Sequence, residues 1–450
     1  STFNVRGRKR NCQRCTGKLS CGRGSGKDTQ GDMSLKKNVW IFNHYATNMY
    51  LDQGGRHYWF AKYLKKSGYH PVIFCANTVH NSDQVIDTGN KNYIELKDGT
   101  NQIPFVFVKV PLYKGNGISR ICNMAGFYRK LFQVTSEYVK THEKPDIILA
   151  SSVHPLTLIA GIKIAKKSGI RCICEIRDLW PESIVKFGKL KENSLIAKSL
   201  YKGEKWIYKK ADALIFTMEG GRNYLEDQKW DVANGGPVDL SKVYYINNGI
   251  DLPAVIEQRK NEPYTDRRFD SIEKQRIIYT GSIRKANGVG VLLDSAKLLK
   301  DKNLMFCIFG DGEEREYLEN RIKEENITNV LFFGKVQKKY IASIVSQAAL
   351  LLLLYSPQIV HVAKYGMSQN KFFDYLAGGS PVISNLPNPY SIINQYECGI
   401  ERKFSGPEEL AECIDKMLSD EKQMNKWGEN AESTAKKFSF EAHTERLTDI

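Results

Sequence analysis

The sequence predicts an α/β protein that contains two successive parallel sheets, each covered by helices on both faces. Its 450 residues exceed one ordinary core and suffice for two or three domains of about 150 residues each. Short apolar runs alternate with segments of helical periodicity, which is typical of parallel sheets. The alternation stops once, at a charged stretch with two prolines, and then begins again. Because 42% of the residues are hydrophobic, disorder throughout the chain is excluded.

The first series begins at Asn38, where a β-rich run is followed by a glycine-containing turn and a helical pattern. Its predicted strands are 38–45, 71–76, 104–110, 146–152, 171–178 and 213–218. Its predicted helices are 58–67, 119–141, 156–168 and 195–210. We therefore expect an N-terminal Rossmann-like domain at 33–252.

The second series begins near Arg276 after a charged segment without apolar periodicity, which we interpret as a linker at 253–274. Its predicted strands are 277–282, 304–310, 330–334, 350–356 and 381–384, and its predicted helices are 291–300, 313–326, 339–348 and 371–377. Residues 407–450 indicate two more helices. We expect a second Rossmann-like domain at 275–430 and a last helix at 431–450 that packs back toward the first domain.

The N-terminal segment 1–32 is basic, poor in apolar residues and without periodicity, so we predict a disordered extension or a vector-derived remnant. Its eight Lys or Arg and two Asp contribute +6 of the formal net charge of +16. The remaining excess favours a polyanionic partner such as a nucleotide phosphate or anionic lipid. Basic residues outside this segment are interspersed with acidic ones, which argues against nucleic acid.

Apolar run lengths and cysteine positions indicate the compartment. The longest apolar run, 348–355, is far shorter than the roughly 20 residues of a membrane-spanning helix. The N-terminus lacks the apolar stretch of a secretory signal. Cys75, Cys172, Cys174 and Cys307 lie inside strand-like runs, where a reduced thiol behaves as a small hydrophobic group. These features predict a cytoplasmic protein.

Strand-to-helix loops are the expected binding positions, because ligands of open parallel sheets bind beyond the carboxyl ends of the strands. The first such loop, DQGGRH, contains Gly54, Gly55 and Arg56, and its glycines allow a phosphate or sugar to approach the backbone closely. A plain turn is the alternative.

A second loop, TGSIRKANG, places Gly281 and Ser282 after a predicted strand and adds the cations Arg284 and Lys285. Backbone amides together with fixed cations suit a diphosphate. Charged turns between strands and helices are nevertheless common, so this loop alone is only moderately specific.

A third segment, SQNKFFDYLAGGSPVI, places Lys371 and Asp374 on neighbouring positions of one helix face. The ammonium could contact phosphate and the carboxylate could accept hydrogen bonds from ribose hydroxyls. The alternative is a surface ion pair that stabilises the fold by less than about 1 kcal/mol.

Three more candidates lie at strand ends of the first series: Arg177 and Asp178 in EIRDLWPES, and His154 in SSVHP. Four charges around a tryptophan are unusual for a simple connection, although a structural Arg–Asp pair explains them equally well. A histidine at such a position is a candidate acid–base group, and a purely structural role is as consistent with the sequence.

Taken together, these loops resemble the family 4 glycosyltransferases of the GT-B fold, in particular the branch that builds bacterial capsular and O-antigen polysaccharides. The resemblance runs from about Asn38 to Phe440. It depends on the segments NHYA with GGRHY, VPLYKGNGISRICNM, ASSVHP, EIRDLWPES, INNGID, YTGSIRKANG, FGDGEE and NKFFDYLAGGSPVI, which occur in the family's order.

The resemblance implies two domains that face each other across a cleft, and retaining transfer of a sugar, a hexose or an N-acetylaminosugar, from a nucleotide diphosphate donor, usually a UDP-sugar. It implies a saccharide acceptor, often polyprenyl-linked, and neither a metal nor another cofactor. Matching positions assign donor binding to Gly281, Ser282, Arg284, Lys285, Val336, Asn370, Lys371 and Asp374, the phosphate or acceptor loop to Gly54, Gly55 and Arg56, and catalysis to His154, Arg177 and Asp178.

The sequence departs from the family pattern at Gly366, where the first carboxylate of the usual Glu, seven residues, Glu motif is missing. Ser282 and Asn287 also replace the common Arg and Lys of the diphosphate loop, which leaves Arg284, Lys285 and Lys371 as candidate cations. Two alternatives therefore stay open: a UDP-sugar 2-epimerase of similar architecture, and a catalytically silent subunit that binds nucleotide sugars.

The segment 116–132 mixes basic and aromatic residues at near-helical spacing. Such a helix can lie on an anionic membrane surface, and it can equally pack on its own sheet. Because the resembling enzymes use polyprenyl-linked acceptors, we expect loose association with the inner face of the cytoplasmic membrane.

Overall fold

Two parallel sheets organise the computed structural model, which describes residues 37–80, 82–115, 117–152, 154–356 and 363–450. The extension predicted at 1–32 lies outside these residues. Residues Lys37–Ile450 form one compact unit that contains both sheets.

The first sheet has the strand order β3-β4-β2-β1-β5-β6-β7-β8, and only the β3–β4 pair is antiparallel. Its strands are β1 (Asn38–Phe42), β2 (His70–Ala76), β3 (Tyr93–Lys97), β4 (Pro104–Val108), β5 (Ile147–Ser151), β6 (Arg171–Ile176), β7 (Ala213–Phe216) and β8 (Val243–Tyr245). Its helices are α1 (Thr47–Leu51), α2 (Arg56–Lys66), α3 (Ile118–Tyr138), α4 (Pro155–Ser168), α5 (Glu182–Lys186), α6 (Leu195–Lys210) and α7 (Gly221–Asp227).

The second sheet is parallel throughout, with the order β11-β10-β9-β12-β13-β14. Its strands are β9 (Gln275–Thr280), β10 (Leu304–Phe309), β11 (Val330–Gly334), β12 (Leu350–Leu353), β13 (Val382–Ser384) and β14 (Gly399–Glu401). The helices of this half are α8 (Leu252–Asn261), α9 (Arg267–Asp270), α10 (Val289–Leu298), α11 (Arg315–Glu324), α12 (Ile341–Val345), α13 (Asn370–Gly378), α14 (Ile392–Gln395), α15 (Pro407–Ser419), α16 (Glu421–Lys437) and α17 (Phe440–Thr448). Short 3-10 turns are η1 (Val232–Asn234), η2 (Leu240–Lys242), η3 (Lys285–Asn287), η4 (Lys338–Tyr340) and η6 (Ala363–Tyr365).

Alternating side chains of the strands fill a separate core on each face of a sheet. In β1, Trp40 and Phe42 belong to one apolar cluster, whereas Val39 and Ile41 belong to another. Each buried side chain of this size stabilises the fold by about 1.5–3 kcal/mol. Because both faces are covered, the strands read as continuous apolar runs, which is why the sequence predicted them.

The connection between the sheets differs from the sequence interpretation. The segment predicted as a linker at 253–274 contains α8 and α9. The Asp251 side chain accepts a hydrogen bond from the Ala254 amide, 2.9 Å away, and Pro253 lies in the first turn of α8. A cap and an early proline both favour a helix start at this point.

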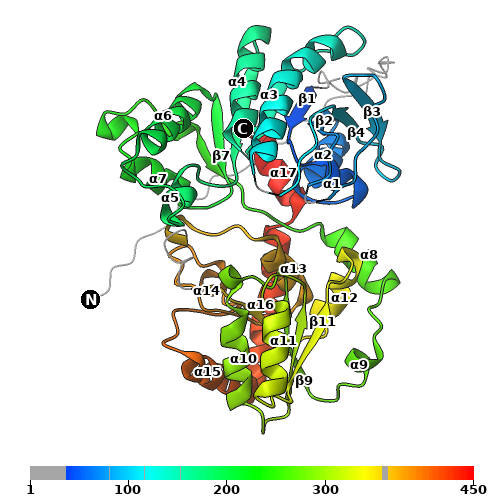
Figure 1. Cartoon of the computed structure of the whole chain (residues 1–450), viewed down its shortest axis with the longest axis vertical. Coiled ribbons are helices and arrows are strands. Elements are labelled where there is room, and N and C mark those ends of the chain that lie inside the picture. Colours follow the sequence, from blue (N-terminus) through cyan, green and yellow to red (C-terminus); the bar gives the residue numbers. More distant parts are fainter. Residues whose placement is uncertain (1–36, 81, 116, 153, 357–362) are drawn as a thin grey trace, which may run out of the picture. The chain divides into compact units, whose positions relative to one another are not determined.

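The C-terminal stretch forms three helices rather than the expected two, and the expected helix at 431–450 is divided between α16 and α17. Between these helices the chain bonds to the connection before α8: the Ile250 amide donates to Phe438 O, and the Phe440 amide donates to Ile250 O. Helix α17 then lies beside α2 (Figure 1), and the Phe440 and Phe60 rings stand 5.5 Å apart. The end of the chain therefore packs on the first sheet's side.

Candidate active site

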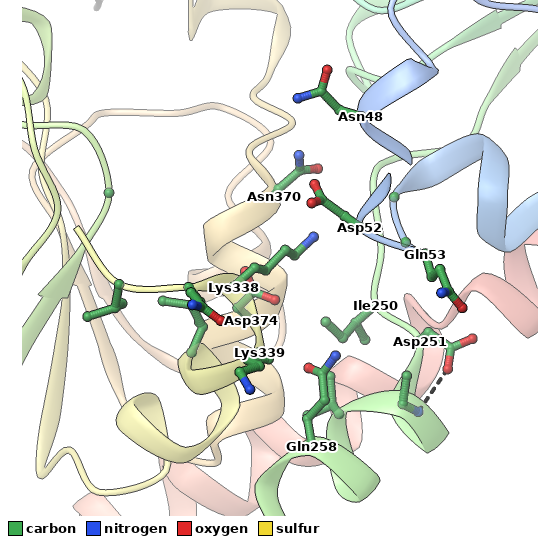
Figure 2. Close-up of a pocket in the computed structure, with 18 of the residues that line it drawn as sticks. Asn48, Asp52, Gln53, Ile250, Asp251, Gln258, Lys338, Lys339, Asn370 and Asp374 are labelled. Atoms are coloured by element: carbon green, nitrogen blue, oxygen red, sulfur yellow. Dashed lines mark hydrogen bonds between the residues drawn. The ribbon is translucent and has the colours of Figure 1, made fainter. Parts of the chain in front are cut away.

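A cavity of about 1140 Å³ lies where strand-to-helix loops of both sheets meet. The first half lines it with residues after β1, and the second half lines it with residues after β9, β10 and β11 and with the start of α13. Residues of α8, in the connection between the sheets, also line it. Figure 2 shows side chains from both halves directed into this space. Of the predicted residues, the cavity brings together Gly54, Gly55, Arg56, Gly281, Ser282, Val336, Asn370 and Asp374.

The glycine turn before α2 approaches the cavity with a backbone shape that only glycine adopts easily. Gly55 has a φ of 102°, and a Cβ built there would lie 3.0 Å from the Met49 side chain. The sequence prediction of a backbone surface at this turn therefore matches the position of Gly54 and Gly55 at the cavity wall.

Arg56 has a different role from the predicted contact with phosphate. Its Nε lies 2.7 Å from Glu175 Oε2, and its two terminal nitrogens donate to the carbonyl oxygens of Asn247 and Ile246. The side chain is buried, with 3% exposure. Its charge is therefore neutralised inside the protein, and the guanidinium fixes the start of α2 to the chain segment after β8.

Glu175 is the centre of this buried network. Its carboxylate also contacts His57 Nε2 at 3.0 Å and accepts from Ser151 Oγ at 2.8 Å. Burial alone would raise the pKa of Glu175, but the charges of Arg56 and His57 hold that pKa well below its usual value. Glu175 is thus ionised, and both of its carboxylate oxygens have partners in the wall that the first half contributes to the cavity.

The second half contributes an ammonium group that has no such carboxylate. Lys371 Nζ stands 4.5 Å from the centre of the Tyr279 ring and 3.4 Å from its hydroxyl. The same nitrogen lies 3.4 Å from a Cβ built on Gly281, so it borders the turn after β9. Burial lowers the pKa of Lys371 to about 7. Among the described residues, no carboxylate forms an ion pair with Lys371.

Asn370 and Asp374 lie one turn apart on α13 and face the cavity (Figure 2). Burial raises the pKa of Asp374 to about 6, while the charge of Lys338 acts in the opposite direction. Lys338 follows β11 and reaches into the space near Asp374 in the same view. Val336 lines the wall two residues before Lys338.

Two predicted cations, Arg284 and Lys285, are exposed and do not line this cavity. The reason is local: the Ile283 amide donates to Asp311 O at 2.9 Å and the Ile283 side chain is fully buried. This contact turns the chain inward, so the two following side chains lie outside. Their assignment to the diphosphate stays a prediction.

The three predicted catalytic residues also lie away from the cavity lining. His154 is buried, and its Nε2 stands 2.6 Å from His44 Nδ1. Burial and the charge of Arg120 lower the pKa of His154 to about 3. The Arg177 amide donates to Ser152 Oγ, and Asp178 lines a second, smaller cavity. Their catalytic roles stay predictions.

Several cavity residues were missed from the sequence. Asn48, Asp52 and Gln53 lie on or just after α1, and Asp251 and Gln258 lie at α8, below them in Figure 2. Asp52 and Gln53 directly precede the glycine pair, so their position in the same loop was an available signal. Helix α8 was not predicted, and its residues therefore had no expected location.

Comparison with known proteins identifies the family. The family model described as Glycosyltransferase Family 4 matches residues 58–253, and that described as Glycosyl transferases group 1 matches residues 265–434. The chain belongs to the family 4 glycosyltransferases. Its two parallel-sheet α/β halves form the GT-B fold, which confirms the fold predicted from the sequence.

Relatives of this family 4 chain are distant in sequence. The probable glycosyltransferase WbjE of Pseudomonas aeruginosa is 21% identical over 192 residues, which cover 42% of this chain and 46% of WbjE. The chain spans about half the length of the curated relatives that it matches. Among solved structures, sucrose-phosphate synthase from Thermosynechococcus elongatus has a TM-score of 0.65 at 16% identity, with coverage of 92% of this chain and 98% of that one. HepE from Anabaena, in complex with UDP, has a TM-score of 0.61 at 12% identity and the same coverage. At such identities the likeness shows the fold alone.

Proposed function

We propose that this family 4 protein is a retaining glycosyltransferase that moves a sugar, a hexose or an N-acetylaminosugar, from a UDP-sugar to a saccharide acceptor. The observation that carries the proposal is the Lys371 ammonium, which borders Gly281, a residue that lines the large cavity, and has no carboxylate partner among the described residues. A buried cation is costly unless an anion joins it. The diphosphate of a nucleotide sugar supplies that anion.

The proposed reaction places the diphosphate between the turn at Gly281 and Ser282 and the start of α13. The bond between the anomeric carbon and the diphosphate oxygen breaks, and an acceptor hydroxyl oxygen attacks that carbon from the leaving group's face. The hydroxyl proton passes to the diphosphate. Because negative charge grows on the leaving group, Lys371 binds the transition state more strongly than the ground state.

Asp374 is suited to accept hydrogen bonds from the ribose hydroxyls, since it faces the same cavity one turn after Asn370. Asn48, Asp52 and Gln53 present polar groups on the opposite wall, where a saccharide acceptor would lie. The solved complex of HepE with UDP supports UDP as the nucleotide. The proposal includes no metal or other cofactor, because Lys371 supplies the positive charge that the leaving group requires.

The role in capsular or O-antigen polysaccharide assembly, with a polyprenyl-linked acceptor, is part of the same proposal. It is supported by the sequence resemblance and by the match to WbjE. No helix in the part of the chain that the structure describes could cross a membrane. A lipid-linked acceptor therefore requires a surface at which the protein meets the bilayer.

The decisive experiment incubates the full chain with UDP-glucose and UDP-N-acetylglucosamine, with and without an extract of lipid-linked saccharides, and separates the products. Transfer predicts that UDP is released and that the sugar appears in the lipid fraction only when acceptor is present. A new sugar nucleotide formed without acceptor would indicate an epimerase. Binding without release of UDP under any condition would indicate a silent subunit.

A further inference from the structure

A second cavity, of about 150 Å³, lies between α4 and α6 and shares no lining residue with the candidate active site. Its walls are mainly apolar. They are formed by Leu156, Leu158, Ile159, Trp180, Pro181, Leu200 and Ile207, together with the polar residues Ser152, Asp178, Ser199 and Glu204. An apolar cavity of this size is large enough for a benzene-sized group and is poorly suited to water.

The Glu204 carboxylate, which lines this cavity, already has its hydrogen bonds. Glu204 accepts hydrogen bonds from the Tyr208 hydroxyl at 2.6 Å and from the Tyr224 hydroxyl at 2.8 Å. Both carboxylate oxygens are therefore occupied. A ligand of this cavity gains little from hydrogen bonds at its base, which favours a hydrocarbon over a saccharide.

Gly203 leaves the cavity open along α6. A Cβ built on this glycine would meet no heavy atom within 4 Å, although Gly203 lines the cavity. Glycine within a helix costs about 0.5–1 kcal/mol relative to alanine, and no positive φ requires it at this position. Neither backbone conformation nor close packing therefore requires a glycine at position 203.

The surface beside the cavity exposes large apolar side chains. Leu195 is 85% exposed, Ile196 65% and Phe187 44%. Ile196 precedes the cavity residue Leu200 by four positions in α6, so the two side chains are neighbours on one helix face. Exposed apolar side chains thus continue toward the lining of the cavity.

This apolar surface lies within a positively charged segment. Residues 186–202, which we call the α5–α6 surface, contain five lysines and one glutamate. Exposed apolar residues surrounded by lysines are the pattern of a surface that lies on an anionic leaflet. A neutral protein partner would not explain the charge, and a nucleic acid would not explain the exposed Leu195 and Ile196.

We propose that the α5–α6 surface rests on an anionic bilayer and that the cavity between α4 and α6 takes one aliphatic chain of a lipid from that bilayer. The lysines contact the headgroups, and Leu195, Ile196 and Phe187 enter the interface. This inference rests on the proposed function. It adds a membrane contact that would bring the protein to the bilayer, where a lipid-linked acceptor is found. It differs from the membrane contact predicted at 116–132, which lies on α3.

The test uses the full chain with phosphatidylcholine vesicles that do or do not contain phosphatidylglycerol. We expect sedimentation with the anionic vesicles only, and a weakening of about fivefold for each lysine of 186–202 that is replaced by glutamine. A Leu195→Asp/Ile196→Asp variant should lose binding, whereas Leu298→Asp, equally apolar and 55% exposed on α10, should not. Equal binding by both variants, or loss only in an Ile118→Asp/Ile121→Asp variant on α3, would overturn the proposed surface.

Entry of a chain into the cavity is measured with vesicles whose acyl chains carry bromine, which quenches nearby tryptophan fluorescence. Trp180 lines the cavity, so quenching should decrease in Trp180→Phe. It should also decrease in Gly203→Phe, which fills the cavity, and persist in the matched control Gly203→Ala. If Trp180→Phe and wild type are quenched alike, no chain occupies the cavity, and this result does not depend on whether Gly203→Phe folds. UDP-glucose binding by these variants, which leave the large cavity intact, separates failure of this site from failure of the proposed function.

Discussion

The affinity for a nucleotide sugar should depend on pH through two residues of α13: Asp374, which lines the large cavity, and Lys371, which borders the cavity residue Gly281. The pH profile should therefore have an acid limb and an alkaline limb. Lys371 has a pKa of about 7 because it is buried, and it must be protonated to bind the diphosphate. Asp374 has a pKa of about 6 for the same reason, and it must be ionised to accept from the ribose. Affinity should therefore rise as the pH increases through about 6 and fall as it increases beyond about 7.

The size of the alkaline limb follows from the Lys371 pKa. At about pH 8 roughly one protein molecule in ten carries the proton before binding, which costs about 1.4 kcal/mol, a tenfold loss of affinity. Each further pH unit costs about the same until the pKa of the complex is reached. Binding at that pH should take up close to one proton from the buffer.

Isothermal titration with UDP-glucose, repeated in buffers of different ionisation enthalpy, measures both quantities. This ligand is suitable because its diphosphate has no proton that titrates near neutrality. Lys371→Met should bind weakly and without the alkaline limb, and Asp374→Asn should lose the acid limb while it keeps the alkaline one. An affinity that stays constant between about pH 7 and pH 8.5, with no proton uptake, would refute the reasoning.

Stability should depend on pH in the opposite sense for the lysine. The unfolded chain keeps the Lys371 proton up to about pH 10.4, whereas the folded protein loses it above about 7, so the unfolded state binds more protons between these values. The free energy of unfolding of wild type, relative to Lys371→Met, should therefore rise with pH across this window. Urea unfolding at several pH values measures this difference, and a difference that falls with pH would contradict the burial of the ammonium.

Three further predictions concern single residues. Glu175→Gln removes the counter-charge of a buried arginine and should lower the free energy of unfolding by about 3–5 kcal/mol in urea, whereas the exposed Glu192→Gln should change it by less than about 0.5 kcal/mol. Lys338→Ala should raise the pKa of Asp374 and move the acid limb of UDP-glucose binding to higher pH, because Lys338 is the charge that lowers that pKa. Lys285→Ala should leave the dissociation constant of UDP-glucose within about twofold, since its side chain lies outside the cavity; a larger loss would restore the sequence assignment.

The sequence predicted strands that are buried on both faces and missed those that are short or at an edge. Strands such as β1 and β12 are continuous apolar runs. Strand β3 pairs only with β4, and its sequence YIELK includes one glutamate and one lysine among five residues, so it gives no such run. Strand β14 has three residues and gives no periodic signal. Helix α8 was missed despite the Asp251 cap and Pro253, because its body lacks an apolar stripe.

For the site, the sequence predicted backbone positions better than side-chain roles. Gly55 and Gly281 are local signals, because a turn between a strand and a helix requires them wherever the rest of the chain lies. The role of Arg56 depends on Glu175, which is 119 positions away in the chain, and no local pattern reports that pairing. The burial that lowers the pKa of Lys371 likewise arises from Tyr279 and the turn at Gly281, in another part of the second sheet.

Charge is distributed unequally between the wall that the first half contributes to the large cavity and the wall that the second half contributes. This difference favours the anionic nucleotide on one wall and the neutral saccharide on the other. On the first wall, the carboxylate of Glu175 balances the charge of Arg56 and also contacts His57, whose pKa is lowered by burial. On the second wall, Lys371 lacks such a partner among the described residues, and Lys338 extends toward the opening. An anionic ligand therefore gains most at the second wall, where Lys371 and Lys338 form no ion pair among the described residues. A neutral saccharide is better matched to the first wall, whose Asn48 and Gln53 offer amides without net charge. This division supports the proposed placement of the nucleotide diphosphate on the second sheet and of the acceptor on the first.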